Sequence, residues 1–263
     1  MRPSRPEPVS LISGSAAEDA SHRTAVDIAV AATQANLPYR LIGGLAVSIL
    51  HAAFGSPGEV PHRLTADADL GVDDQILVGS DVGRVLEELG YTQVEGNRFI
   101  HGSGVSQRTI DVLVPTMGDH LVTNIPVGPL RVDAVPGLRL ALDTPPLTVA
   151  LTAVLSSGEA LSADLSLPGV VPATVLKAYA FAARSEPRDL LDLWKLLEVA
   201  HLLGLSFDDW EPMRAQKRDA ALVLHDRVGS RPSVGATMSR RHGWPHARLA
   251  ALVQTQVPNP RPH

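Results

Sequence analysis

The stretch HRLTADADL, residues 62–70, places Asp67 and Asp69 one residue apart among small and apolar side chains. Its alternation predicts a β-strand, in which side chains two residues apart project from the same face. Two carboxylates held that close repel each other, and the repulsion raises their pKa values. A divalent cation removes the penalty, and carboxylate oxygens suit Mg²⁺ or Mn²⁺. Paired aspartates also occur at the exposed ends of ordinary strands, so the meaning of this pair depends on the rest of the chain.

A glycine pair precedes the aspartates. The segment YRLIGG, residues 39–44, predicts a short strand that runs into Gly43 and Gly44, where the helical segment LAVSILHAAF begins. Glycines at such a junction let backbone N–H groups approach a phosphate, and the helix N-terminus adds a favourable field. The same two residues would also suit an ordinary turn.

A third aspartate follows in a second alternating segment. Asp111 lies in RTIDVLVP, residues 108–115, between two branched apolar residues. A carboxylate on such a strand needs a partner if it is buried. A neighbouring strand would bring Asp111 beside Asp67 and Asp69, and three carboxylates can hold two metal ions for in-line phosphoryl transfer.

Lysine is scarce in this chain. Only Lys177, Lys195 and Lys217 occur among 23 basic residues. Lys177 lies in the apolar helical segment ATVLKAYAFAA, residues 173–183. It could carry its ammonium to the surface along the aliphatic stem, or bind a triphosphate as a compact point charge.

The pattern of elements predicts an α+β protein. Residues 18–38 and 81–91 have helical spacing, and residues 121–167 contain short β-prone runs between turns. From residue 172 the pattern becomes helical, with a break near Pro187. We therefore expect a mixed sheet flanked by helices in an α/β domain over 1–167, and a mostly helical domain with a basic tail over 168–263.

Composition limits the remaining possibilities. There is no cysteine, which excludes disulfides and thiolate metal sites, and no P-loop or dinucleotide-binding glycine motif is present. The longest apolar run, PPLTVALTAVL, is too short to span a bilayer, so we expect a cytoplasmic protein without a membrane partner. The formal net charge is −5, yet every charged residue after Asp226 is an arginine. That basic end predicts either a solvated tail or an RNA-docking surface.

In this order, the segments resemble the AbiEii-type nucleotidyltransferase toxins, a branch of the polymerase-β-like nucleotidyltransferase superfamily that includes the MenT toxins. The resemblance spans about residues 39–197. The matching residues are Gly43, Gly44, His62, Arg63, Thr65, Asp67, Asp69, Asp111, Lys177, Arg184, Arg188, Asp189 and Asp192. It implies a polymerase-β-like mixed sheet followed by helices.

The resemblance also implies an activity, the transfer of an NMP from an NTP to an acceptor. The first acceptor to expect is the 3′ end of tRNA, in the toxin of a toxin–antitoxin or abortive-infection system with a cognate antitoxin. Two alternatives stay open. One is an enzyme that modifies a small molecule of the aminoglycoside type or a protein hydroxyl, and the other is an inactive member that binds nucleotide or a partner chain.

The resemblance assigns roles residue by residue. Nucleotide binding is implied for Gly43, Gly44, Arg63, Thr65 and Lys177. Binding of Mg²⁺ or Mn²⁺ is implied for Asp67, Asp69 and Asp111. The implied catalytic residues are Asp67, Asp69, Asp111, Lys177 and Asp189, with Asp192 as second choice to Asp189. Two features qualify this assignment: Arg188 stands where the family has lysine, and a carboxylate just after Pro187 would also suit a helix N-terminus.

Overall fold

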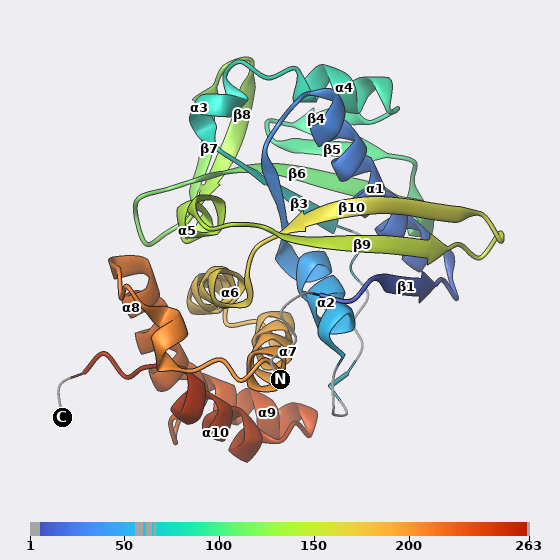
Figure 1. Ribbon diagram of the computed structural model, residues 1–263. Coiled ribbons are helices and arrows are strands. Elements are labelled where there is room, and N and C mark those ends of the chain that lie inside the picture. The colour runs from blue at the N-terminus through green and yellow to red at the C-terminus, as the bar shows by residue number, and fades with distance from the viewer. Residues whose placement is uncertain (1–5, 56–59, 62–64, 66, 262–263) are drawn as a thin grey trace.

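The computed structural model describes residues 6–55, 60–61, 65 and 67–261 (Figure 1). Its larger sheet has seven strands, and five of them follow the order β2-β3-β6-β5-β4, while β8 pairs with β6 and β7. These strands are β2 (Tyr39–Ile42), β3 (Asp67–Val72), β4 (Thr92–Glu95), β5 (Arg98–His101), β6 (Arg108–Pro115), β7 (Val122–Val127) and β8 (Leu130–Val135). Both strands predicted to carry aspartates are present, and they are neighbours.

A smaller sheet lies beside the larger one. Its order is β1-β9-β10, and its strands are β1 (Val9–Ile12), β9 (Leu147–Val154) and β10 (Ala160–Leu167). The hydroxyl of Ser166 on β10 donates to the Tyr39 carbonyl oxygen at 2.9 Å, which joins this sheet to β2. The predicted β-prone runs of residues 121–167 are therefore strands of two different sheets.

Helices flank the sheets and form the C-terminal third. Those of the first part are α1 (Ala16–Gln34), α2 (Gly43–Phe54), α3 (Asp74–Leu77), α4 (Val82–Glu88) and α5 (Leu138–Asp143). Those of the last part are α6 (Val170–Arg184), α7 (Pro187–Leu202), α8 (Ala215–Val223), α9 (Val234–His242) and α10 (His246–Gln256). Short 3₁₀ turns occur at Gly104–Ser106 and Phe207–Trp210, and α8 continues into a π-helical segment, Leu224–Gly229.

The predicted α+β class is confirmed. Strands end at Leu167, and every element described after it is helical. In Figure 1 the helices α8, α9 and α10 lie at the opposite end of the molecule from α4, with α6 between them and the sheets. The arginine-rich end is folded into α9 and α10, which corrects the interpretation of this segment as a solvated tail.

Two main hydrophobic clusters hold these layers together. One joins the larger sheet to α1 and α2 and includes Leu196 of α7. The other lies among α6, α7, α8 and α10 around Phe181 and Trp194. Pro187 at the first turn of α7 sharply separates α6 from α7, as the sequence predicts, because proline is compatible only with the start of a helix. None of the described helices has the length and apolar character needed to cross a membrane.

Strand register places the charged residues in one row. Asp69 on β3 lies opposite Ile42 on β2 and, on its other side, opposite Asp111 on β6. Asp111 in turn lies opposite Arg98 on β5. Beyond Arg98, the first residue of β5, β6 pairs with β8 instead, and this pairing places Asp133 opposite Leu113. The larger sheet thus collects side chains from four strands at one place.

Candidate active site

A cavity of about 290 Å³ opens over this row of side chains. One wall comes from the β2–α2 junction and the strands β3, β5, β6 and β8, and the facing wall comes from α6. The residues that line it include Gly43 and the charged residues Asp69, Arg98, Asp111, Asp133, Lys177 and Arg184. Four residues predicted for the site, namely Gly43, Asp69, Asp111 and Lys177, therefore share one cavity.

Position 43 requires a glycine, because its backbone is left-handed and lies against the side chain of Asp69. Its φ is +79°, a left-handed conformation that residues with a side chain rarely adopt. A Cβ at this position would lie 2.0 Å from Oδ2 of Asp69. The Asp69 carboxylate thus lies against the first turn of α2, where the helix N-terminus favours negative charge. Gly44 follows within α2 and is not among the residues that line the cavity.

The surroundings of Asp69 disfavour the ionised form of its carboxyl. The pKa of its carboxyl is raised to about 6, with burial as the largest cause; Asp111 and Asp67 add to the upward shift, while Lys177 and Arg184 oppose it. A carboxylate that carries a raised pKa in a cavity gains from any cation that binds beside it.

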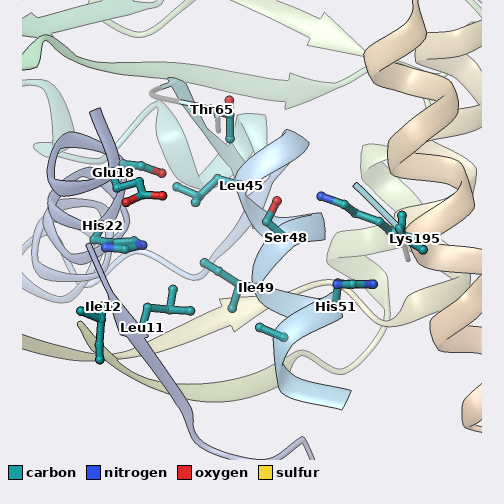
Figure 2. A pocket seen from close by; sticks show the side chains of 13 residues that line it. Leu11, Ile12, Glu18, His22, Leu45, Ser48, Ile49, His51, Thr65 and Lys195 are labelled. Carbon is teal, nitrogen blue, oxygen red and sulfur yellow. The ribbon is translucent and has the colours of Figure 1, made fainter. Parts of the chain in front are cut away.

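Asp67 lies at the exposed start of β3, two residues from Asp69, and does not line the cavity. The hydroxyl of Thr65 donates to the Asp67 carbonyl oxygen at 3.3 Å. Thr65 itself lines a second cavity, of about 190 Å³, together with side chains of α1 and α2 and with Lys195 of α7 (Figure 2). Arg63, predicted to bind nucleotide, lies outside the described residues.

Asp111 is bound by an arginine that the sequence did not identify. Arg98 Nε and Nη2 donate to its two carboxylate oxygens, each at 2.9 Å. The ion pair raises the pKa of Arg98, with the hydrogen bond to Asp111 as the largest cause. The signal in the sequence is weak, because Arg98 enters the site only through the pairing of β5 with β6.

Beneath the cavity, α7 holds the two cations of α6. Lys177 Nζ lies 2.7 Å from Oδ2 of Asp192 and 4.0 Å from Oδ1 of Asp189. Arg184 donates to both oxygens of Asp189, at 2.7 and 3.1 Å. Asp189 and Asp192 are each 1% exposed and are not among the cavity-lining residues. Asp189, predicted to be catalytic, thus pairs with Arg184 and lies 4.0 Å from Lys177, behind the residues that line the cavity.

Arg188 stands where the resembling family has lysine. Its guanidinium contacts Glu186 at 2.5 Å, and nearly half of its side chain is exposed. The cation partners of the buried Asp189 and Asp192 are therefore Arg184 and Lys177 of α6, not the residue next to Asp189 in the chain.

Asp133 is a further carboxylate that the sequence did not identify. It lines the cavity from β8, and its Oδ1 accepts a hydrogen bond from the backbone N–H of Asn124 at 2.9 Å. Asp119, on the loop after β6, lines the same cavity and pairs with His120 at 2.9 Å. This end of the cavity is acidic, whereas the α6 wall is basic.

The carboxylate oxygens at the site are of the type that binds a divalent cation, but the described residues do not position them as a complete metal site. Over the described part of the chain, no three potential ligands are gathered as a metal ion would require. At Asp111, both oxygens accept hydrogen bonds from Arg98. Asp67 and Asp69 offer hard oxygen donors on one strand, and the raised pKa of Asp69 favours cation binding.

Comparison with known proteins gives a distant structural similarity. No protein-family model matches the chain, and no curated protein matches it. Among solved structures, the antibiotic-resistance factor ANT(2'')-Ia is similar, with a TM-score of 0.38 and 12% sequence identity over 85% of this chain and 94% of that chain. At this level of similarity, an activity has to be argued from the geometry of the site itself.

Proposed function

We propose that this protein is a metal-dependent nucleotidyltransferase that moves an NMP from an NTP to a hydroxyl acceptor and releases pyrophosphate. One observation carries the proposal: the glycine turn at Gly43, the carboxylates Asp69 and Asp111, and the cation Lys177 line one cavity. Phosphoryl transfer depends mainly on positioning and charge stabilisation, and this cavity supplies anionic and cationic groups on facing walls. We assign the chain to the AbiEii/MenT type on its ordered motifs.

Each wall of the cavity has a role in this proposal. Lys177 and Arg184 bind the triphosphate, because their charges are held at the cavity by Asp192 and Asp189. The backbone at Gly43 leaves room for a phosphate beside the start of α2. Asp67 and Asp69, joined by Asp111, would hold Mg²⁺ or Mn²⁺. Such an ion, when bound, neutralises charge on the reacting phosphates.

The first acceptor that we propose is the 3′ end of tRNA, with the protein acting in the cytoplasm as a toxin restrained by a cognate antitoxin. Six arginines follow Asp226. Three of them contact distant segments of the protein: Arg227 contacts the Ala182 carbonyl oxygen, Arg248 contacts Glu198, and Arg261 contacts Asp226. The other three are Arg231, Arg240 and Arg241, and all are exposed, although Arg240 also donates to the hydroxyl of Thr237 one turn earlier. These exposed arginines support docking of an RNA backbone.

The acidic end of the cavity supports a second candidate acceptor. Asp119 and Asp133 lie where an acceptor would meet the nucleotide, and two carboxylates suit a cationic small molecule of the aminoglycoside type. A protein hydroxyl, the third acceptor considered, gains no comparable support. The grouping of Gly43, Asp69 and Lys177 in one cavity argues against an inactive member, for which these residues need not converge.

Label transfer tests the proposal directly. The purified protein is incubated with each α-labelled NTP and Mg²⁺ or Mn²⁺, in separate reactions with total tRNA and with a panel of aminoglycosides. We expect label on tRNA, lost in Asp69→Asn and kept in Asp164→Asn, a matched change at an exposed position of β10. Label on aminoglycosides alone would select the second acceptor, and no transfer to any acceptor would refute the activity.

A further inference from the structure

Arg98 and Asp111 form a two-point contact inside the proposed site. They face each other across β5 and β6, and both carboxylate oxygens of Asp111 accept from the guanidinium at 2.9 Å. A planar guanidinium matched to a carboxylate in this way is among the stronger charged contacts in proteins. While it persists, Asp111 cannot offer its oxygens to a metal ion without giving up a hydrogen bond.

The two partners differ in their freedom to move. The side chain of Asp111 is 14% exposed and is fixed on a central strand, whereas that of Arg98 is 42% exposed. Arg98 also has a second carboxylate nearby, since its Nη1 lies 3.8 Å from Glu95. Arg98 is therefore the partner that can leave with little rearrangement of the sheet.

Arg98 also lies where an alternative anion would arrive. It lines the same cavity as Lys177 and Arg184, the two cations assigned to the triphosphate. Those two are already anchored by buried carboxylates of α7, so they keep their positions whether or not a nucleotide is present. Arg98 differs from them, because its carboxylate partner is itself a proposed metal ligand.

We propose that Arg98 is a positioning residue that keeps Asp111 from coordinating metal until a nucleoside triphosphate enters the cavity, whose phosphates then draw Arg98 away. The inference rests on the proposed function. It orders the binding events: metal meets Asp67 and Asp69 first and weakly, and Asp111 completes the site only with the nucleotide. It also explains why no three ligands are gathered within the described residues.

Metal binding without nucleotide tests this order. Mn²⁺ alone is titrated into the wild type and Arg98→Gln, with free ion measured by electron paramagnetic resonance, at about 0.1 M and about 1 M salt. We expect Arg98→Gln to bind Mn²⁺ roughly tenfold more tightly, because Asp111 becomes available. The gain should persist at high salt, where long-range charge effects are screened, and should vanish when Asp111→Asn is added. Arg218→Gln, an exposed arginine of α8, is the matched control and should show no gain.

Nucleotide binding provides the opposite readout. Arg98→Gln should bind a non-hydrolysable NTP analogue with Mn²⁺ roughly tenfold more weakly, because one phosphate contact is lost. A merely structural role for Arg98 would weaken both kinds of binding. Mn²⁺ affinity that is unchanged or reduced in a folded Arg98→Gln variant, or a gain seen only at low salt, would overturn the proposal.

A second variant covers the case in which Arg98→Gln does not fold. Arg98→Lys keeps the charge but cannot make the two-point contact, so it should tighten Mn²⁺ binding by a smaller factor, about threefold. Absence of that gain in a folded Arg98→Lys protein would equally overturn the proposal. The Mn²⁺ titration requires no transfer reaction. If no acceptor is labelled but the Mn²⁺ gain is found, the proposed function fails while the control of Asp111 by Arg98 stands.

Discussion

Two pairs of aspartates carry equal charge in contrasting surroundings. Asp189 and Asp192 on α7 are buried, and each has a cation of α6 within 2.7 Å. Asp67 and Asp69 on β3 have no ion pair with lysine or arginine within the part of the chain that the structure describes. Burial consequently raises the pKa of Asp69 to about 6.

The contrast separates carboxylates paired inside the fold from carboxylates that we propose meet a ligand. On α7 the cost of burying carboxylates is offset inside the protein, and two cations are held at the wall of the cavity. On β3 the charges of Lys177 and Arg184 offset the penalty only in part, since the pKa of Asp69 stays at about 6, and a penalty of this kind is typical of functional sites. The same substitution, aspartate to asparagine, should therefore have different consequences in the two places.

The largest effect on stability is expected at Asp192. Asp192→Asn leaves Lys177 buried with only the 4.0 Å contact to Asp189, so we expect the free energy of unfolding to fall by about 3 kcal/mol. Urea denaturation at neutral pH measures the loss. Replacing both partners, Lys177→Met with Asp192→Leu, should restore most of the stability but no transfer activity. A loss below about 1 kcal/mol would show that the α7 pair does not carry the charge balance assigned to it.

Asp67 should show the reverse pattern, with a large effect on activity and little on stability. Asp67→Asn is expected to lower the rate of nucleotidyl transfer on the order of 10²–10³-fold, because one preorganised charge is lost. Its side chain is exposed, so the free energy of unfolding should change by less than about 0.5 kcal/mol. Full activity of a folded Asp67→Asn protein, measured by initial rates of label transfer, would remove Asp67 from the proposed metal site.

Gly43→Ala tests the close contact between the Asp69 carboxylate and the start of α2. Gly43→Ala places a Cβ 2.0 Å from Asp69 Oδ2 in a left-handed conformation, so we expect a loss of about 2–3 kcal/mol. Gly158→Ala is the matched control, since Gly158 has φ +86° and open space around its Cβ position, and it should cost only about 1 kcal/mol. Thermal unfolding of both variants measures the difference. Equal losses would mean that Asp69 does not press against the start of α2.

Local pattern was enough to predict the elements that carry the aspartates. The alternation of RTIDVLVP gave the strand β6 with its bounds, and Pro187 gave the break between α6 and α7. Gly43, Asp69, Asp111 and Lys177 were predicted as one site, and they line one cavity. Only the two-residue spacing of Asp67 and Asp69 follows a local period, and the grouping of the four cavity residues was implied by the order of the motifs along the chain.

Apart from the neighbouring strand that brings Asp111 beside Asp69, features that depend on pairing between distant segments were not predicted. Arg98 and Asp133 enter the cavity only because β5 and β8 both pair with β6, one after the other. The parallel pairing of β1 with β9 likewise joins segments far apart in sequence. The pairing of Asp189 likewise depends on how α6 packs against α7, because its partners are Arg184 and Lys177 and not the adjacent Arg188.

The smallest expected effect is a change in the free energy of unfolding that should have opposite signs for an aspartate of β3 and an aspartate of α7. The pKa of Asp69 in the folded protein, about 6, lies above its ordinary value of 3.8. Between these values the unfolded chain loses its proton first, so the contribution of Asp69 to stability falls as the pH rises, and the cost is complete above about pH 6. Asp69→Asn removes that cost and should stabilise the metal-free protein by about 1–2 kcal/mol at pH 8, allowing for the screening of a half-buried group.

Most of the gain should be lost at about pH 4, where the folded carboxyl is protonated and the unfolded one is near its midpoint of 3.8. Urea denaturation with a chelator, at pH 4 and pH 8, measures it, and Asp189→Asn serves as the counterpart that should lose stability at pH 8. Added Mn²⁺ should narrow or reverse the difference at pH 8, because the ion stabilises only a protein that binds it. If Asp69→Asn were less stable than the wild type at pH 8 without metal, the carboxylates of β3 would be structural like those of α7, and the argument for a cation at this strand would fail.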